Sequence, residues 1–230
     1  MSRKLGTFAK YAFLVIASIL SVFPLVWMII AATNKSVDVI AGKLTLGANL
    51  IENYKNLVSM QPVWGSFANS CKYSLLVTVV ALLISSMAGY AFEIYKSKWK
   101  ELGYTLVLMT MMVPFVALMI PLFQMYSKAG LLNKAVGFML PSIATPLLIM
   151  MFRTGAKSFP REIIEAARID GLGEIRIFFQ MFMPVTKSTY AAAAVVTFMN
   201  AWNNYLWAKV IMLFLRQNCL QQKQKSFTKT

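Results

Sequence analysis

The sequence of 230 residues contains no histidine. Because histidine is the side chain that titrates near physiological pH and is a common metal ligand, histidine acid–base relays and histidine metal sites are excluded. Only two cysteines are present, Cys71 and Cys219, and their spacing indicates no disulfide framework. We therefore predict neither a catalytic site nor a metal site.

Acidic residues are also scarce, since eight Asp and Glu stand against 23 Lys and Arg. These acids form no catalytic pair within an apolar segment. A phosphate-binding P-loop is missing as well: Gly42 and Gly47 have its glycine spacing, but Ala48 and Asn49 follow where Lys and Ser or Thr are required. The chain is thus not expected to hydrolyse ATP, and any energy that it uses comes from a separate subunit.

Hydrophobic residues make up 58% of the chain, and charged residues make up only 13%, about half the share of a soluble domain. Five apolar stretches have the length of about 20 residues that a bilayer span requires. They lie at about 11–32, 73–92, 103–123, 136–152 and 189–208. Because helices satisfy their own backbone groups in an apolar setting, we predict an all-α, polytopic transmembrane helical bundle, formed as one domain over residues 1–208.

The first apolar stretch has an alternative interpretation. Arg3, Lys4 and Lys10 precede it, as cations precede the core of a secretory signal. The apolar run continues past Pro24 to Ala32, however, whereas a signal core has about 7–15 residues. We predict a retained first span, with cleavage as the alternative.

The lysines and arginines beside the spans predict the orientation of the chain. With a cytoplasmic N-terminus, twelve cations lie inside and six lie outside. The inner set is Arg3, Lys4, Lys10, Lys96, Lys98, Lys100, Arg153, Lys157, Arg161, Arg168, Arg176 and Lys187, and the outer set is Lys35, Lys43, Lys55, Lys72, Lys128 and Lys134. We predict a multi-pass protein of a bacterial-type cell membrane, and no nucleic-acid surface, because the cations are divided between both sides.

No ionisable residue lies well inside a predicted span, which disfavours an ion-coupled carrier. The spans instead carry hydroxyls, amides and aromatic rings, which suit a neutral, hydroxyl-rich solute. The densest cluster is Asn200, Trp202, Asn203 and Asn204. We predict that it lines a substrate pathway; an interfacial aromatic belt and, for single polar residues, hydrogen bonding between helices are the alternatives.

Four prolines interrupt the third and fourth predicted spans: Pro114, Pro121, Pro141 and Pro146. Each removes a backbone hydrogen bond and bends or breaks a helix. Bends of this kind suit alternating access, and static packing around a kink is the alternative.

The loop between the fourth and fifth spans, 153–188, carries a polar helical hairpin. Pro160 is suited to start a short helix, and Gly171 is suited to end it in the left-handed conformation. Apolar residues then recur at helical spacing and predict a second, amphipathic helix over 173–183 that stops before Pro184.

Two adjacent alanines in the first helix of this hairpin, Ala166 and Ala167, leave nearly bare backbone. Such a surface lets another protein approach closely, so we predict a docking site. An amphipathic hairpin resting on the lipid surface is the alternative, although a lipid surface gains nothing from the alanine pair or from the glycine stop.

The run Glu165-Ala166-Ala167-Arg168-Ile169-Asp170-Gly171, with Pro184 thirteen residues past the glycine, resembles the cytoplasmic coupling loop of the membrane subunits of ABC-type importers. Met181 and Met183 stand where that loop usually has Ile and Leu. Phe159-Pro160-Arg161-Glu162, Ala129-Gly130-Leu131-Leu132-Asn133 and Ala201-Trp202-Asn203-Asn204-Tyr205-Leu206-Trp207 are similar to the carbohydrate-importer branch. The resemblance covers about residues 10–208.

This resemblance implies a type I ABC importer permease, in which a sixth span follows the five predicted here. It implies half of a pore formed with a homologous permease subunit, a carbohydrate delivered by an extracytoplasmic binding protein, and ATPase subunits that hold ATP and Mg²⁺, while this chain binds no cofactor. Within the loop, Glu165 and Asp170 would shape or anchor it, Ala166 and Ala167 would allow close docking, and Gly171 would make its turn; Pro184 completes the coupling motif.

The C-terminal segment departs from the family pattern. After Trp207 the family has a proline, an external loop and the sixth span, whereas this chain continues with Ala208, Lys209 and a polar run. We expect 209–230 to be an atypical, disordered tail and the chain to be truncated or frame-shifted. A non-transporting membrane scaffold or an inactive truncated permease is therefore the alternative to a working permease.

Overall fold

A computed structural model of the chain describes residues 2–212, and every regular element among them is a helix. The all-α prediction is confirmed for these residues. Most of the predicted tail, residues 213–230, lies outside them, while 209–211 form the end of the last helix, α13 (Tyr205–Ile211). The described residues form two compact units, divided between Phe67 and Ala68.

The first unit contains α1 (Ser2–Thr33), α2 (Ser36–Ile40) and α3 (Leu50–Met60). Two asparagines complete the end of α1. Nδ2 of Asn34 donates to the carbonyl of Ile30 at 2.9 Å, and Nδ2 of Asn53 on α3 donates to the carbonyl of Ala32 at 2.8 Å. Both bonds satisfy carbonyls that a helix end leaves free, and the bond from Asn53 also fastens α3 to α1.

The second unit contains the remaining helices, and the division falls within the first turns of α4. They are α4 (Val63–Ile94), α5 (Lys98–Met109), the 3₁₀ turn η1 (Thr110–Met112), α6 (Phe115–Lys128), α7 (Ala135–Ile143), α8 (Pro146–Lys157), α9 (Arg161–Ile169), α10 (Glu174–Ile177), the π-helical segment η2 (Phe178–Phe182), α11 (Met183–Val185), α12 (Lys187–Trp202) and α13.

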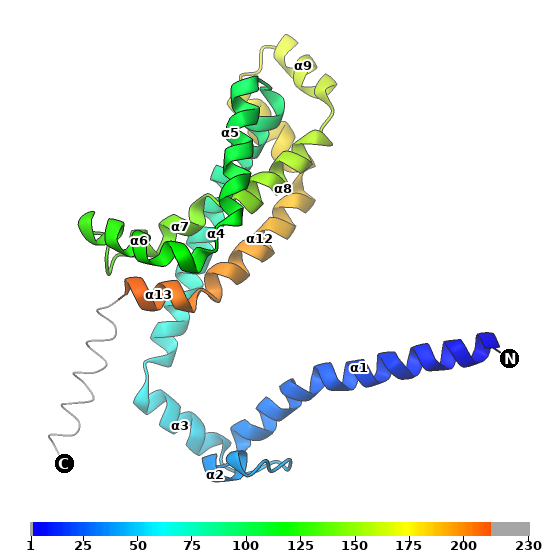
Figure 1. Ribbon diagram of the computed structural model, residues 1–230, viewed down its shortest axis with the longest axis vertical. Coiled ribbons are helices and arrows are strands. Elements are labelled where there is room, and N and C mark those ends of the chain that lie inside the picture. The colour runs from blue at the N-terminus through cyan, green and yellow to red at the C-terminus, as the bar shows by residue number, and fades with distance from the viewer. Residues whose placement is uncertain (1, 213–230) are drawn as a thin grey trace. The chain divides into compact units, whose positions relative to one another are not determined.

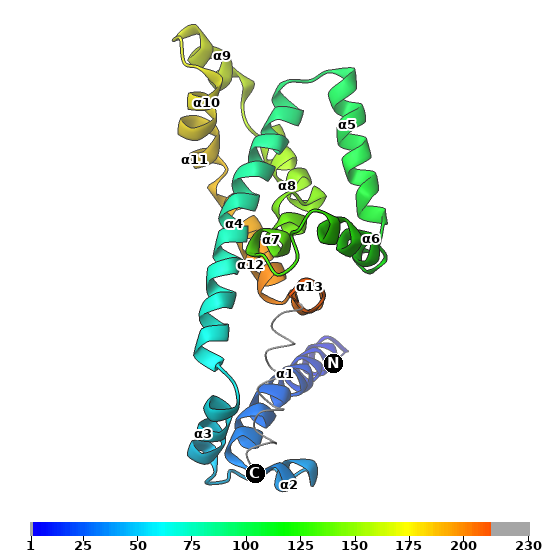
Figure 2. The same cartoon turned by 90° about the vertical axis from the view of Figure 1, so that its left-hand side faces the viewer.

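Three helices of the second unit, α4, α8 and α12, pack side by side (Figures 1 and 2). Ala81, Leu148, Phe152 and Ala193 form a buried apolar cluster between them. The backbones of α4 and α8 touch at Gly89, where a Cβ atom would come within 2.7 Å of the amide nitrogen of Arg153. The crossing of these two helices therefore requires glycine at this position.

Two of the five predicted spans are single helices long and apolar enough to cross a membrane, Gly6–Thr33 and Val63–Ile94. The third and fourth predicted spans are bent. The α5–η1 helix meets α6 at 103°, and α7 meets α8 at 44°. The described residues thus provide two membrane-crossing helices, or four if each bent pair counts as one span.

The two bends fall at Pro114 and Pro146, as predicted. Pro114 directly precedes α6, and Pro146 is the first residue of α8, where the missing N–H is tolerated. Pro121 and Pro141 lie inside α6 and α7 and do not end them. The third predicted span, 103–123, is therefore a bent pair of helices, because the chain turns sharply before Pro114.

The fifth predicted span, 189–208, is divided between α12 and α13 by the pair Asn203-Asn204. With 16 residues, α12 is about 24 Å long, which is less than the roughly 30 Å of a hydrocarbon core. The count of five spans therefore stays a prediction.

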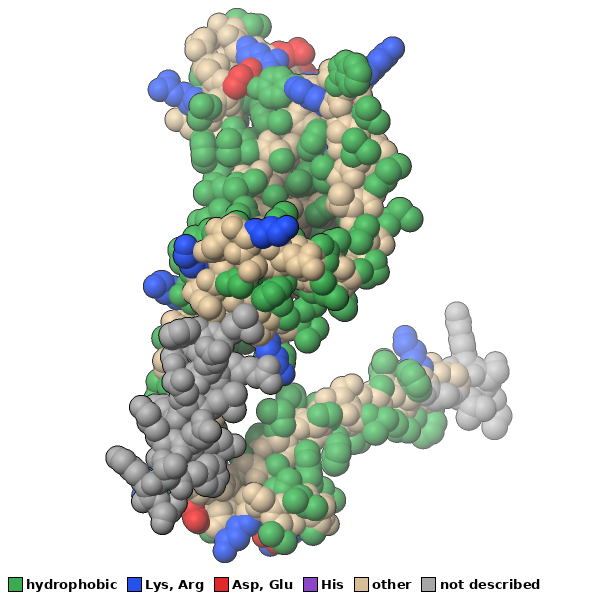
Figure 3. Space-filling model, turned by 60° about the vertical axis from the view of Figure 1, so that its left-hand side comes forward, with side chains coloured by type: hydrophobic (Ala, Val, Ile, Leu, Met, Phe, Trp, Pro, Cys, Tyr) green, Lys and Arg blue, Asp and Glu red, His purple; other side chains and the backbone are tan. Residues whose placement is uncertain are grey.

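Charged side chains gather at the end of the second unit that carries α9 and α10, whereas hydrophobic side chains cover the helices beside it (Figure 3). Leu75, Val79, Leu102 and Leu106 are each more than half exposed. Apolar side chains exposed in such number are expected of a helix bundle whose surroundings are lipid. The second unit thus has an apolar body and one end where side chains of both charges gather, while further cations lie elsewhere on it.

Candidate functional site

The polar hairpin at this charged end is formed by α9, α10, η2 and α11. Helix α9 begins directly after Pro160. It ends in a Schellman motif: the amide of Gly171 donates to the carbonyl of Arg168 at 3.0 Å, and the amide of Leu172 donates to that of Ala167 at 2.9 Å. Gly171 has a φ of +78°, so the prediction that it ends the helix in the left-handed conformation is confirmed.

The second half of the hairpin continues further than predicted. Helix α10 passes directly into η2, and α11 extends the helical chain to Val185. The prediction that the helix stops before Pro184 is therefore wrong. Pro184 lies in the first turn after the π-helical segment, where a missing N–H is tolerated, and the amide of Thr186 already bonds to the carbonyl of Phe182 at 3.0 Å.

An aromatic cluster lies beneath the hairpin. The ring centroid of Tyr90 on α4 is 5.5 Å from that of Phe178 and 4.9 Å from that of Phe182, both on η2. Ile164 and Ala167 of α9 are buried in the same cluster. The hairpin therefore packs its apolar side on its own chain.

The two alanines of the motif have opposite surroundings. Ala166 is exposed, whereas Ala167 is 1% exposed and packs in the aromatic cluster. The expectation that both leave bare backbone for a partner is wrong for Ala167, because its methyl group faces its own chain. Only Ala166 remains available for close docking.

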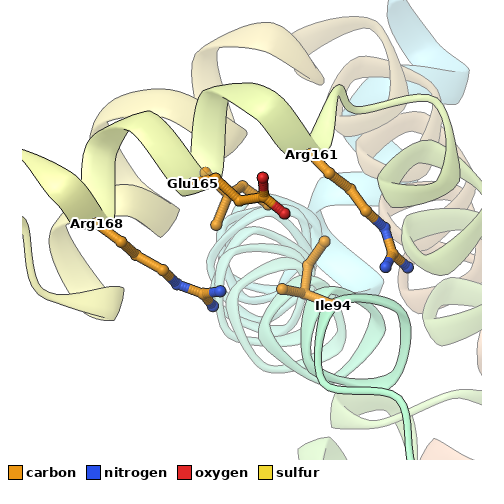
Figure 4. A pocket seen from close by; sticks show the side chains of 5 residues that line it. Ile94, Arg161, Glu165 and Arg168 are labelled. Atoms are coloured by element: carbon orange, nitrogen blue, oxygen red, sulfur yellow. The ribbon is translucent and has the colours of Figure 1, made fainter.

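Glu165 and Asp170 lie on the exposed surface of α9. Figure 4 shows the carboxylate of Glu165 between the side chains of Arg161 and Arg168, near Ile94 at the end of α4. Arg161 and Arg168 are four residues before and three residues after Glu165, the spacings at which side chains on a helix surface are neighbours. Together they present both signs of charge on the exposed surface of α9.

Tyr95, Arg168 and Glu174 fasten the hairpin to the end of α4. Nε of Arg168 donates to Oε1 of Glu174 at 2.7 Å, and the hydroxyl of Tyr95 donates to Oε2 of the same carboxylate. The bond from Arg168 holds the pKa of Glu174 below its usual range, and that carboxylate in turn raises the pKa of Arg168. Burial and the bond to Glu174 raise the pKa of Tyr95 to about 12.

A second charged cluster, which the sequence prediction missed, lies at the base of the hairpin. Glu93 on α4 is 4% exposed and Arg153 on α8 is 7% exposed, and Nε of Arg153 donates to Oε2 of Glu93 at 3.2 Å. Each residue stands at the end of an apolar stretch, where a charge is usually solvated. The available signal was their opposite sign at two ends that the predicted topology places on the same side of the membrane.

The segment from Asn200 to Trp207 contains the break between α12 and α13. Asn200, Trp202 and Asn203 are exposed, and Asn204 is half-buried. Asn200 lines a small cavity of about 50 Å³ together with Ser142, Thr145 and Thr197. The cavity lies beside the bend between α7 and α8, so amide and hydroxyl groups gather where the helix is broken.

The two tryptophans of this segment differ in their exposure to solvent. Trp202 is 36% exposed, whereas Trp207 is fully buried. The ring of Trp207 lies 5.5 Å from that of Tyr126 and 5.9 Å from that of Phe115, measured between centroids. Trp207 therefore joins α13 to α6 as part of a packed cluster, and the role of the remaining residues in a substrate pathway stays a prediction.

No metal-binding group of three His, Cys, Asp or Glu side chains gathers within residues 2–212. The carboxylates of Glu93 and Glu174 are instead paired with Arg153 and Arg168. Charged groups at this end of the molecule thus bind one another and brace helices.

Comparison with known proteins identifies a family match. Residues 81–217, more than half of the chain, match the family described as "Binding-protein-dependent transport system inner membrane component". The matched stretch contains the whole hairpin and all the residues of the Asn200 to Trp207 segment.

Several curated proteins are similar over most of this chain. The lactose transport system permease protein LacG of Rhizobium radiobacter is 46% identical, over 92% of this chain and 78% of its own length. The arabinooligosaccharides transport system permease protein AraQ of Halalkalibacterium halodurans is 36% identical, over 84% of this chain and 71% of its own. The sn-glycerol-3-phosphate transport system permease protein UgpE of Escherichia coli is 28% identical, over 90% of this chain and 76% of its own length.

A solved structure has the same fold. It is the crystal structure of a bacterial ABC transporter involved in the import of the acidic polysaccharide alginate, with a TM-score of 0.83 and 22% sequence identity. The match covers 92% of this chain and 76% of the other. The predicted helical bundle thus has a solved counterpart.

Proposed function

The chain belongs to the family of binding-protein-dependent transport system inner membrane components, and we propose that it is the permease subunit of an ATP-driven carbohydrate importer. Membership makes it a multi-pass membrane protein and a transport subunit rather than an enzyme. The predicted resemblance to ABC importer permeases is confirmed.

A neutral carbohydrate is the solute that we propose. Two relatives above 30% identity are named for lactose and for arabinooligosaccharides. A phosphorylated solute would require a cation to pair with, and Arg153, a buried cation at the end of the fourth predicted span, is already bonded to two carboxylates. Hydroxyl and amide groups at the α7–α8 bend and on α12 suit sugar hydroxyls, so we propose that Asn200, Trp202, Asn203 and Asn204 line the pathway.

The partners that we propose are a homologous permease subunit, ATPase subunits that hold ATP and Mg²⁺, and an extracytoplasmic binding protein. Residues 1–208 would form the transmembrane domain, with the N-terminus and the loop 153–188 in the cytoplasm. Closure of the ATPase subunits around ATP would then push the hairpin and turn the pore toward the outside.

One observation carries the coupling role of the hairpin. Glu165, Ala166 and Asp170 are exposed on α9, while the same helix is held to α4 by the bonds of Arg168, Glu174 and Tyr95. A partner that binds the exposed side of α9 therefore acts on a braced element rather than on a loose loop. Gly171 sets the turn between the two halves, and Pro184 lies where the hairpin returns toward α12.

The test is co-expression of a tagged chain with its proposed ATPase and second permease subunits, followed by pull-down from detergent. We expect the wild type and Ala166→Ser to recover the ATPase, and Ala166→Arg to recover at least about tenfold less, a loss of about 1.4 kcal/mol. Ala166 is the position to vary, since an arginine at Ala167 would disturb the buried cluster.

The outcomes separate the alternatives. Recovery of the ATPase by the wild type together with uptake of radiolabelled lactose or an arabinooligosaccharide supports the permease. Recovery without uptake of either sugar supports the membrane scaffold. Equal recovery by Ala166→Arg and the wild type contradicts docking at this surface of α9.

A further inference from the structure

The side chain of Arg153 joins three helices at the base of the hairpin. It extends from α8, and its Nε donates to Oε2 of Glu93 on α4 at 3.2 Å. Its Nη2 donates to Oε1 of Glu101 in the first turn of α5 at 2.6 Å. The guanidinium also lies over the ring of Tyr104 on α5, 4.0 Å from its centroid. Arginine suits such a place because its planar group bonds at its edge and stacks on its face.

The same cluster reaches the first residue of α9. The second oxygen of Glu93, Oε1, lies 2.8 Å from Nζ of Lys96 and 4.0 Å from Nη2 of Arg161. Glu93 is therefore surrounded by three cations, only one of which, Arg153, is itself buried. A buried carboxylate needs such partners to remain charged. Through Glu93 the hairpin helix α9 is linked to both α4 and α8.

The cluster lies next to the crossing of α4 and α8, where a shift of its side chains also affects α5. Gly89 lies one helical turn before Glu93, at the point where the backbones of α4 and α8 touch, so the two helices have no room to approach further. Helix α5, in contrast, is linked to α8 here by the Arg153–Glu101 bond and the Tyr104 stacking. A rigid α4–α8 crossing and a polar link to α5 thus meet at one side chain.

We propose that Arg153 is a positioning residue that transmits movement of the hairpin to α4 and α5, and this inference rests on the proposed transport function. When α9 moves, Arg161 and the covalent connection from α8 act on the Glu93–Arg153 pair from two sides. Because Arg153 also holds Glu101, the displacement passes to α5 and from there to the 103° bend before α6. Arg153 binds neither ATP nor solute.

A structural role alone makes a different prediction. Replacing both partners of a buried ion pair by apolar residues is often tolerated, whereas removing one partner leaves the other charge buried. In Arg153→Met, Glu93 keeps Lys96 as a partner at 2.8 Å. If Arg153 merely filled space, Arg153→Met would leave an assembled importer with unchanged coupling. If Arg153 positions α5, the same variant would assemble, hydrolyse ATP and move less solute for each ATP.

The experiment measures transport per ATP in proteoliposomes that contain the full complex, with radiolabelled lactose and the loaded binding protein. We expect Arg153→Met to lower the lactose-to-ATP ratio at least about fivefold, and Arg153→Lys, which keeps the charge but not the fork, to lower it about twofold. Glu101→Gln removes one arm of the cluster and is expected to resemble Arg153→Lys. Lys98→Met, at an exposed cation that begins α5 and lies outside the cluster, is the matched control and should keep the wild-type ratio.

An unchanged ratio in assembled Arg153→Met complexes overturns the positioning role. If Arg153→Met does not assemble, the lactose-to-ATP ratio of Glu101→Gln decides, and an unchanged ratio again overturns the positioning role. This variant should assemble, because the side chain of Glu101 is 47% exposed and its loss leaves no buried charge at that position. Failure of the wild type to recover the ATPase overturns the proposed function, and with it this inference. Uncoupling by the variants after normal ATPase recovery supports both.

Discussion

The hairpin and the break between α12 and α13 hold their polar side chains in different ways. In the hairpin, Arg168 and Tyr95, the residue directly after α4, both donate to Glu174, above an aromatic cluster buried within the chain. At the break, the asparagines lie at or near the surface, and the connection to the rest of the unit is made by the buried ring of Trp207.

This difference indicates different roles for the two regions. A hairpin fixed by charged bonds to another helix transfers a push, because its side chains cannot move independently of α4. A helix break beside a small polar cavity, anchored on one side by an aromatic cluster, allows the asparagine side to change its shape. The first arrangement suits coupling, and the second suits a solute pathway.

The largest expected effect breaks the anchor of the α12–α13 region. Trp207→Ala removes a fully buried ring from its contacts with Tyr126 and Phe115, and we expect a loss of about 3–5 kcal/mol of unfolding free energy. Trp202→Ala, on the same segment but 36% exposed, should cost less than about 1 kcal/mol. Thermal unfolding of both variants in detergent measures the pair. Equal losses would remove the distinction between a buried anchor and an exposed side chain.

Local backbone chemistry explains what the sequence predicts well. Gly171 ends α9, and Pro114 and Pro146 mark the two bends, because the conformational preferences of glycine and proline act within a few residues. Pro121 and Pro141 do not end their helices, and neither does Pro184. A π-helical segment over residues 178–182 lets the helix continue through Pro184. The sequence of these five residues does not predict such a segment.

Tertiary contacts explain what the sequence does not predict. Ala166 and Ala167 have identical side chains, and only the position of the aromatic cluster decides which of them is buried. Glu93 and Arg153 are 60 residues apart, so their pairing depends on how α4 and α8 cross. The prediction that residues 200–204 line a substrate pathway rests on composition alone, which does not distinguish a buried ring such as Trp207 from an exposed one such as Trp202.

A smaller effect tests the turn of the hairpin. Gly171→Ala forces a side chain into the left-handed region at φ +78°, which costs about 1–2 kcal/mol although no atom crowds the site. Gly173→Ala is the matched control, since its φ of −73° suits alanine and its surroundings are equally open. Hydrogen exchange of the last amides of α9 should become about tenfold faster in the first variant and remain unchanged in the second. Similar exchange in both would show that the glycine stop does not hold the hairpin.

The smallest expected effect concerns the hydrogen bond between Tyr95 and Glu174. The pKa of Tyr95 is raised to about 12. The protonated hydroxyl therefore contributes fully to the stability of the fold below the ordinary tyrosine pKa of about 10, and this contribution is lost as the pH rises through 12. The pKa of Glu174 is lowered. The ionised carboxylate therefore contributes to stability above the ordinary glutamate pKa, and this contribution is lost as the pH falls through the lowered pKa.

The unfolding free energy of the wild type should therefore exceed that of Tyr95→Phe by about 0.5–1.5 kcal/mol from about pH 5 to 10. This difference should vanish toward pH 12. Thermal unfolding midpoints of the two chains across this range measure it, with Tyr205→Phe, at an exposed tyrosine, as the control. A difference that persists at pH 12 would mean that the ring of Tyr95, rather than its hydroxyl, fastens the hairpin. In that case packing alone would brace α9, and the charged bonds would not distinguish the hairpin from the α12–α13 break.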